Sequence, residues 1–174
     1  QDGKTFRYFD HNVKLAAPQP LTDQDQIHHL LVPLKAYDVV PFLKQVKPRL
    51  AADAQIILCH NGMGTLEQAK TLLPPAARLY FCTTSNGVYI EGNEAVLAGR
   101  GPSYWSQLTG TPEASHQDFT PELSNSDFET LFGSAEERRD LDYILWQKLL
   151  VNSVINPLTA IHDIANGDLL KAKH

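Results

Sequence analysis

A stripe of polar side chains is predicted on one face of an otherwise apolar helix near the carboxyl end of the sequence. Residues 140–156 have the apolar spacing of an amphipathic helix. Lys148, Asn152 and Asn156 recur there at four-residue intervals, which places them on one side of the helix. The stripe is either solvated surface or one wall of a cleft. Surface positions of a helix usually favour Glu, Lys, Arg and Gln over Asn, a weak helix former, and this speaks for the cleft.

In a cleft, these residue types would suit chemistry at a carbonyl group. A lysine ammonium can donate a proton or a hydrogen bond to a carbonyl oxygen as that oxygen becomes an alkoxide. Asparagine amides can hold a hydroxyl or a carboxylate without adding charge. Lys148 is therefore the candidate proton donor, and the two asparagines are candidate binding groups.

A second candidate site is the turn that follows the apolar run at residues 55–59. Gly62 and Gly64 allow the backbone to turn sharply, and Thr65 with Gln68 has the pattern of a capping box at a helix start. Ligands of open α/β sheets bind at the carboxyl ends of strands, where this turn falls. The alternative is a glycine-rich connection without a ligand, because Glu67 stands where a dinucleotide fingerprint has its third glycine.

Short strands alternate with helices before these elements, which predicts a parallel sheet with covering helices. The expected strands are residues 27–34, 55–59 and 79–84, the expected helices are 38–46 and a stretch from 65, and the expected hairpins are 4–15 and 88–97. Residues 101–121 are rich in Pro, Ser, Thr and Gly and are expected to form a loop or a meander. A short helix within 119–132 and the helix at 140–156 then predict the start of a second, helical domain.

Composition excludes several functional classes. The formal net charge is −5 and the basic residues are scattered, which argues against nucleic-acid or anionic-membrane partners. No apolar run approaches a bilayer span, and the amino end lacks the apolar region of a signal peptide, so a cytoplasmic location is expected. Cys59 and Cys82 lie in apolar strand segments and are expected to be reduced. The histidines and cysteines do not form a zinc-binding pattern, so we predict no metal site.

Three segments of the sequence carry a family resemblance: Leu34-Lys35-Ala36, His60-Asn61-Gly62-Met63-Gly64-Thr65, and residues 146–161. They are similar to the ketopantoate reductase (2-dehydropantoate 2-reductase) family. The resemblance implies a Rossmann-type NADPH domain joined to a helical domain. It also implies reduction of a small 2-keto acid, ketopantoate, to pantoate in pantothenate and coenzyme A biosynthesis, and it allows a homodimer. The fold class expected is therefore α/β: an incomplete Rossmann-like parallel sheet with covering helices in residues 1–122, then the start of a helical C-terminal domain in residues 123–174.

The resemblance also implies roles for individual residues. Lys148 matches the family's catalytic lysine, the general acid that protonates the carbonyl oxygen while hydride arrives from the nicotinamide. Substrate-binding asparagines of the family match Asn152, Asn156 and Asn166. NADPH contacts of the family match Lys35 and Asn61, and Val88 falls near a further cofactor contact.

The sequence departs from the family pattern in two respects. The family's Gly-x-Gly-x-x-Gly turn, and the basic residue that recognises the 2′-phosphate of NADPH, do not occur in these 174 residues. The serine and glutamate that the family's C-terminal domain supplies do not occur either. We therefore expect a central portion of a reductase that is inactive in isolation. The alternative is a truncated, non-catalytic relative that serves as a small-molecule-binding or interaction module.

Overall fold

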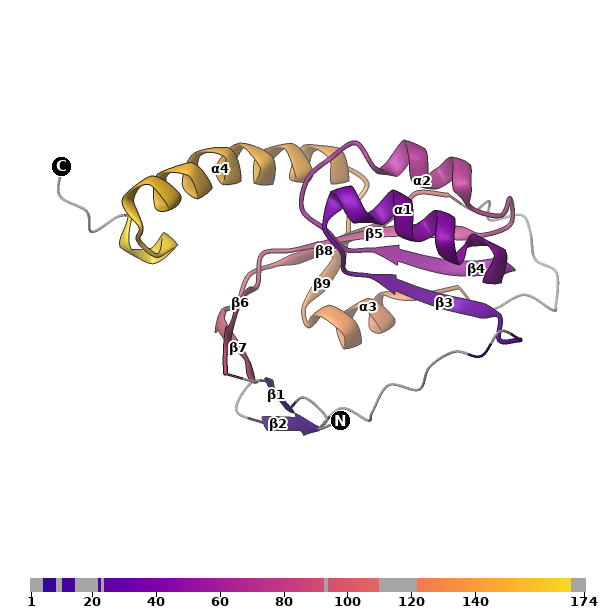
Figure 1. Cartoon of the computed structure of the whole chain (residues 1–174), viewed down its shortest axis with the longest axis horizontal. Coiled ribbons are helices and arrows are strands. Elements are labelled where there is room, and N and C mark those ends of the chain that lie inside the picture. The colour runs from indigo at the N-terminus through magenta and orange to yellow at the C-terminus, as the bar shows by residue number, and fades with distance from the viewer. Residues whose placement is uncertain are drawn as a thin grey trace.

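The computed structural model describes residues 5–8, 11–14, 22, 24–92, 94–109 and 122–169. Its main layer is a five-stranded sheet in the order β3-β4-β5-β8-β9 (Figure 1). The first three of these strands run parallel, β8 runs antiparallel to β5, and β9 is parallel to β8. The strands are β3 (Ile27–Val32), β4 (Leu50–Leu58), β5 (Arg78–Thr84), β8 (Ser103–Gln107) and β9 (Ala135–Glu137).

Helices cover both faces of this sheet, because its central strands are apolar on both sides. On one face lie α1 (Ala36–Val46) and α2 (Leu66–Leu72), whose Val39, Leu43 and Ala69 are buried against β4 and β5. The short 3-10 helix η1 (Lys47–Arg49) ends α1, as expected from Pro48. On the other face lies α3 (Asn125–Phe132). The expected α/β fold, with a Rossmann-like parallel sheet and covering helices, is confirmed.

Residues 101–121 were expected to form a loop or a meander, and the loop alternative was wrong at residues 103–107, which form β8. This strand pairs with β5 along its whole length, and Trp105 is buried among Tyr80, Phe128 and Ala135. Only two of its five side chains are buried, too few for an alternating pattern to stand out in the sequence. Residues 110–121 lie outside the described residues.

A second sheet has the strand order β2-β1-β7-β6. The two expected hairpins are confirmed, because β1 pairs with β2 and β6 pairs with β7, both antiparallel. The two hairpins are joined by a parallel pairing of β1 with β7, which the sequence did not predict. The strands are β1 (Thr5–Tyr8), β2 (His11–Lys14), β6 (Gly87–Glu91) and β7 (Glu94–Gly99).

The last long element, α4 (Leu141–His162), begins over the sheet and extends away from it (Figure 1). It is longer than predicted, because the helix continues through Pro157. The helix ends at Asp163 in the left-handed conformation, and the 3-10 helix η2 (Asn166–Asp168) follows it. Among the described residues, no helix is long and apolar enough to cross a membrane.

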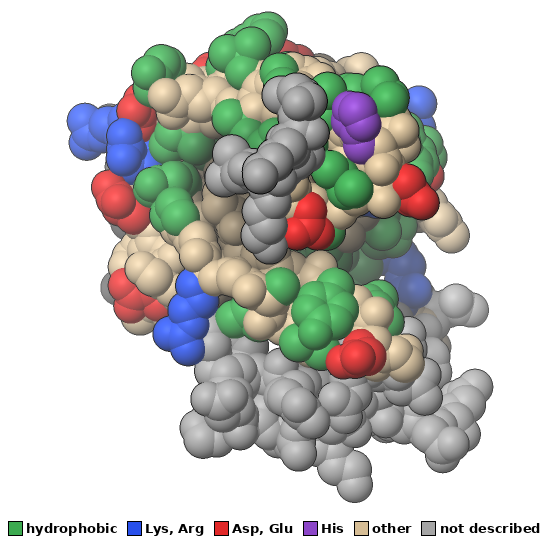
Figure 2. Space-filling view, turned by 90° about the vertical axis from the view of Figure 1, so that its left-hand side faces the viewer, with side chains coloured by type: hydrophobic (Ala, Val, Ile, Leu, Met, Phe, Trp, Pro, Cys, Tyr) green, Lys and Arg blue, Asp and Glu red, His purple; other side chains and the backbone are tan. Residues whose placement is uncertain are grey.

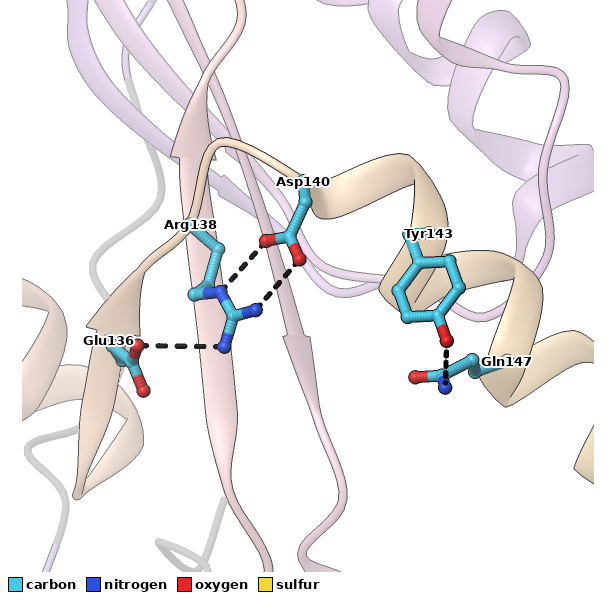
Figure 3. A network of polar contacts seen from close by, with 5 residues as sticks. All are labelled: Glu136, Arg138, Asp140, Tyr143 and Gln147. Atoms are coloured by element: carbon cyan, nitrogen blue, oxygen red, sulfur yellow. Dashed lines mark hydrogen bonds and ion pairs between the residues drawn. The ribbon is translucent and has the colours of Figure 1, made fainter.

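An ion-pair network stands at the start of α4 (Figure 3). The Arg138 guanidinium donates two hydrogen bonds of 2.8 and 2.7 Å to the Asp140 carboxylate, and it lies 3.6 Å from a Glu136 carboxylate oxygen. The hydrogen bonds from Arg138 hold the pKa of Asp140 below its ordinary value. Asp140 therefore holds Arg138 instead of capping the helix with its side chain.

The main sheet includes β9 and is covered by α3, although both elements follow residue 122 in the sequence. Phe128 of α3 stacks on Trp105 of β8, with ring centroids 4.0 Å apart. Ala135 and Glu136 of β9 pair with β8. These contacts place residues 125–137 with the sheet, and α4 is the first element that departs from it.

Candidate functional site

Two adjoining hollows lie where the parallel strands end. The first has a volume of about 470 Å³ and lies at the carboxyl ends of β3, β4 and β5. The second has a volume of about 840 Å³ and lies between the end of β5, α4 and η2. Lys148 and Asn61 line both hollows. These volumes fall within the range of about 300–1,000 Å³ that is typical of small-molecule sites.

Lys148 is held at the junction of the two hollows by the end of β5. Its Nζ donates one hydrogen bond of 2.9 Å to the Thr83 hydroxyl and another of 2.6 Å to the Thr84 carbonyl oxygen. The side chain is half-buried, and burial lowers its pKa below the ordinary lysine value. The thiols of Cys59 and Cys82 partly oppose this shift. The result is an ammonium group that gives up its proton more readily than a solvated lysine does.

The glycine-containing turn places Asn61 at the mouth of these hollows. The buried His60 ring contacts the Phe81 ring edge-on at 5.0 Å, and its Nε2 is 2.8 Å from the Thr65 hydroxyl. Burial lowers the pKa of His60, which favours the neutral imidazole. Gly62 has a φ of 95°, which favours glycine.

The predicted capping box at this turn was wrong. The Thr65 side chain makes no capping hydrogen bond to α2, because its hydroxyl bonds His60. The signal for a capping box is local in the sequence, whereas the His60 ring is brought to Thr65 by the turn that the two glycines allow.

The structure brings five of the seven predicted site residues together. Lys35, at the start of α1, lines the smaller hollow with Asn61 and Lys148. Asn152, one turn along α4, lines the larger hollow, and so does Asn166 of η2. These residues come from four separate elements, so the sheet and α4 together create the site.

Two predicted residues lie apart from the hollows. Asn156 is exposed on α4, two turns beyond Lys148. Val88 is exposed on β6. Neither is among the described residues that line the two hollows.

The sequence analysis missed Thr83 and Thr84, which fix the lysine. Their position directly at the end of a buried apolar strand was the available signal, since that is where the ligands of open α/β sheets bind. Asn86, which lines both hollows, was also missed. Its side-chain oxygen accepts a hydrogen bond of 2.9 Å from the Gly101 N–H, so it ties the start of β6 to the approach of β8.

Comparison with known proteins gives consistent results for both parts of the chain. Residues 1–110 match the family model described as "Ketopantoate reductase PanE/ApbA", and residues 140–174 match "Ketopantoate reductase PanE/ApbA C terminal". A 2-dehydropantoate 2-reductase of Shigella flexneri is 34% identical over 140 residues, which are 80% of this chain and 43% of that protein. The chain therefore spans less than half the length of this relative.

Solved structures show the same fold at lower sequence identity. A probable 2-dehydropantoate 2-reductase from Bacillus subtilis is similar with a TM-score of 0.64 and 20% identity, over 97% of this chain and 55% of that one. A D-mandelate dehydrogenase solved with NADH and anilino(oxo)acetate is similar with a TM-score of 0.72 and 20% identity, over 92% and 51% of the two chains. On the strength of the family model that matches residues 1–110, this chain belongs to the ketopantoate reductase family.

Proposed function

We propose that the protein carrying this chain reduces 2-dehydropantoate to pantoate with NADPH, in pantothenate and coenzyme A biosynthesis. The observation that carries the proposal is the half-buried Lys148, fixed where two small-molecule-sized hollows meet, with Asn152 and Asn166 lining the larger of the two. The shifted pKa of a lysine that lies in a cleft marks it as a candidate functional group. The similarity to 2-dehydropantoate 2-reductases supports the choice of substrate.

Lys148 acts as the general acid in the proposed reaction. A lysine ammonium carries three N–H donors, and two of them are used on Thr83 and Thr84. The third remains for the carbonyl oxygen of the substrate, and the two fixed bonds orient it. As the carbonyl oxygen gains charge, the Lys148 N–H stabilises it and then transfers its proton.

The asparagines bind the rest of the substrate. Asn152 and Asn166 line the larger hollow, where their amides can hold the carboxylate and hydroxyl ends of a keto acid without adding charge. Asn156 lies further along the same helix, and we propose that it contacts the distal end of the substrate.

The smaller hollow suits the nicotinamide half of the cofactor. Its lining combines the Lys35 cation, the Asn61 amide and the Thr83 hydroxyl. The cation can bind an anionic phosphate, and the amide and the hydroxyl can bind the polar groups of a ribose or a carboxamide. When bound, the cofactor supplies the hydride. Lys35 and Asn61 would orient it. We propose that Val88, which lies on β6 outside this hollow, contacts a part of the cofactor that extends beyond it.

Several features of the whole protein are part of the same proposal. We propose a cytoplasmic protein, and a homodimer like the dimeric ketopantoate reductase of Staphylococcus aureus, which has a similar fold. We also propose two domains, an NADPH-binding domain and a helical domain. Since residues 125–137 pack on the sheet, the helical domain would begin at α4 rather than directly after residue 122.

Exposed apolar side chains along α4 support this division. Leu150, Val154 and Ile161 are 64, 59 and 75% exposed. Viewed from the left of Figure 1, the molecule shows hydrophobic side chains at several places on its surface (Figure 2). An apolar helix surface of this kind is expected where a helical domain continues to pack on α4.

The proposed function is tested by steady-state assay of the purified full-length protein. We expect oxidation of NADPH that depends on ketopantoate, with a higher kcat/KM than for pyruvate or benzoylformate, and a lower kcat/KM when NADH replaces NADPH. Binding of ketopantoate without any turnover would refute the enzymatic proposal and favour a binding module.

Replacing Asn152 or Asn156 by Ala should weaken keto-acid binding by about 1–3 kcal/mol. In the first variant a substrate polar group would lose its partner in the larger hollow, and in the second the distal end of the substrate would lose the contact proposed above. NADPH affinity should stay within about twofold, which corresponds to about 0.4 kcal/mol. Calorimetric titration of each ligand measures both effects. The matched control is Ser153→Ala, since Ser153 lies between the two asparagines and its hydroxyl bonds the Leu150 carbonyl oxygen of its own helix. Loss of NADPH binding with normal keto-acid binding would assign these residues to the wrong ligand.

A further inference from the structure

Two cysteines lie side by side at the ends of neighbouring strands, next to the proposed active site. The parallel register of β4 and β5 ends with Leu58 opposite Phe81. Cys82 is the next residue of β5, and Cys59 directly follows β4, where its N–H still bonds the Val32 carbonyl oxygen of β3 at 3.1 Å. A hydrogen bond between the two thiols places them side by side. Ile57 and Tyr80, two residues earlier, pack together on the face of the sheet that α3 covers. Because side chains alternate along a strand, both thiols face that same side.

The two thiols differ in exposure. Cys82 is fully buried, with Trp105 and Phe128 in the same cluster, whereas Cys59 is partly exposed. Both cysteines line the smaller hollow together with Lys148 and Asn61. Because Cys82 is 0% exposed and Cys59 is partly exposed, a small reagent that enters this hollow reaches Cys59 first.

The surroundings also shift the pKa values of the two thiols in opposite directions. A hydrogen bond with Cys82 lowers the pKa of the Cys59 thiol, burial opposes this, and the Lys148 ammonium lowers it further. The same hydrogen bond, together with burial, raises the pKa of Cys82. Cys59 is thus the sulfur that takes the thiolate form, which is the nucleophilic form of cysteine.

We propose that Cys59 and Cys82 form a peroxide-sensitive thiol pair in the lining of the smaller hollow. In the first step, the Cys59 thiolate sulfur attacks hydrogen peroxide. The O–O bond breaks, sulfenic acid forms on Cys59, and hydroxide departs; it takes up the proton that the Cys59 thiol had released and becomes one water. In the second step, the Cys82 sulfur attacks the Cys59 sulfur, the S–O bond breaks and a disulfide forms. The Cys82 proton passes to the departing hydroxide, which leaves as a second water. Two thiols are oxidised and one peroxide is reduced, so atoms and electrons balance.

The strand geometry permits this bond. Neighbouring strands lie about 4.8 Å apart, and a disulfide needs Cα atoms separated by about 4.4–6.8 Å. The bond would join the ends of β4 and β5 directly beside Asn61 and Thr83. Oxidation would therefore alter the lining of the smaller hollow, to which Lys148 also belongs.

The chain contains two cysteines, and trypsin separates them into the peptides 50–70 and 79–100. After treatment of the reduced full-length protein with equimolar hydrogen peroxide, we expect these two peptides to appear joined by mass spectrometry, and to separate on addition of dithiothreitol. Recovery of both peptides unlinked and fully alkylated would overturn the proposal.

Two variants test the order of the steps. Cys82→Ser should halt the reaction at the first step, so that a dimedone probe labels Cys59, and Cys59→Ser should leave Cys82 unlabelled because it is buried. Labelling of Cys82 in the second variant would contradict the assigned order. If Cys82→Ser does not fold, Cys82→Ala gives the same readout without placing a hydroxyl among Trp105 and Phe128.

A further measurement rests on the proposed function. Saturating NADPH should slow the labelling of Cys59 at least several-fold, since Cys59 lines the hollow assigned to the nicotinamide. If the disulfide forms and NADPH gives no protection, the thiol pair stands and the placement of the cofactor fails. The two proposals can therefore fail separately.

Discussion

Replacing Lys148 by Ala should lower kcat for ketopantoate reduction about 10²-fold or more in the full-length protein, the usual scale for loss of a general acid. The substitution removes the ammonium that Thr83 and Thr84 hold between the two hollows, and none of the other described residues that line both hollows is a lysine or an arginine. Steady-state kinetics and circular dichroism of the purified variant measure the loss and the retention of the fold.

The matched control is Lys44→Ala on α1, because Lys44 is exposed and lies outside both hollows. It should leave kcat unchanged. A folded Lys148→Ala variant with near-normal turnover would remove Lys148 from the mechanism.

The pH profile gives a second readout of the same group. The acid is the ammonium form, and burial lowers its pKa. The rate should therefore be highest below that pKa, and it should fall as the pH rises through a value lower than that of an ordinary lysine. Lys148→Arg keeps the charge but does not titrate in this range, so its lower rate should lack the alkaline fall.

Replacing Phe128 by Ala should destabilise the protein by about 3–5 kcal/mol, the usual cost of emptying a buried aromatic site. Phe128 is fully buried and stacks on Trp105 at 4.0 Å, with the Tyr80 ring at 5.6 Å. These contacts join α3 to β5 and β8, so the variant would leave a cavity under the strand that ends at Thr84. Urea unfolding followed by fluorescence measures the change.

Leu131→Ala, on the same helix, is the matched control. Leu131 is 50% exposed, so this substitution should change the free energy of unfolding by at most about 1 kcal/mol. A cost for Phe128→Ala as small as that of the control would mean that α3 contributes little to the stability of the sheet.

The sequence by itself determined the elements whose signals are local. The apolar run before Cys59 predicted a buried strand, and the four-residue spacing of Lys148 and Asn152 predicted a polar stripe on a helix. Motifs around Asn61 and Lys148 predicted the family. These signals are readable because strand and helix periods are imposed over a few consecutive residues.

Local signals failed where a distant segment determines the structure. β8 exists because Trp105 packs against Phe128 and pairs with β5, and neither contact is visible from residues 103–107 alone. The Thr65 hydroxyl bonds His60 instead of capping α2 for a similar reason.

Only the tertiary structure decided the geometry of the site. The hydrogen bonds from Lys148 to Thr83 and Thr84 join residues more than sixty positions apart. The placement of Cys59 beside Cys82 follows from the register of two parallel strands. A helix period fixes which residues share a face. The direction of that face is set by the packing of α4 over the sheet, where Leu141 and Leu145 join a buried cluster whose other members begin at Ile27.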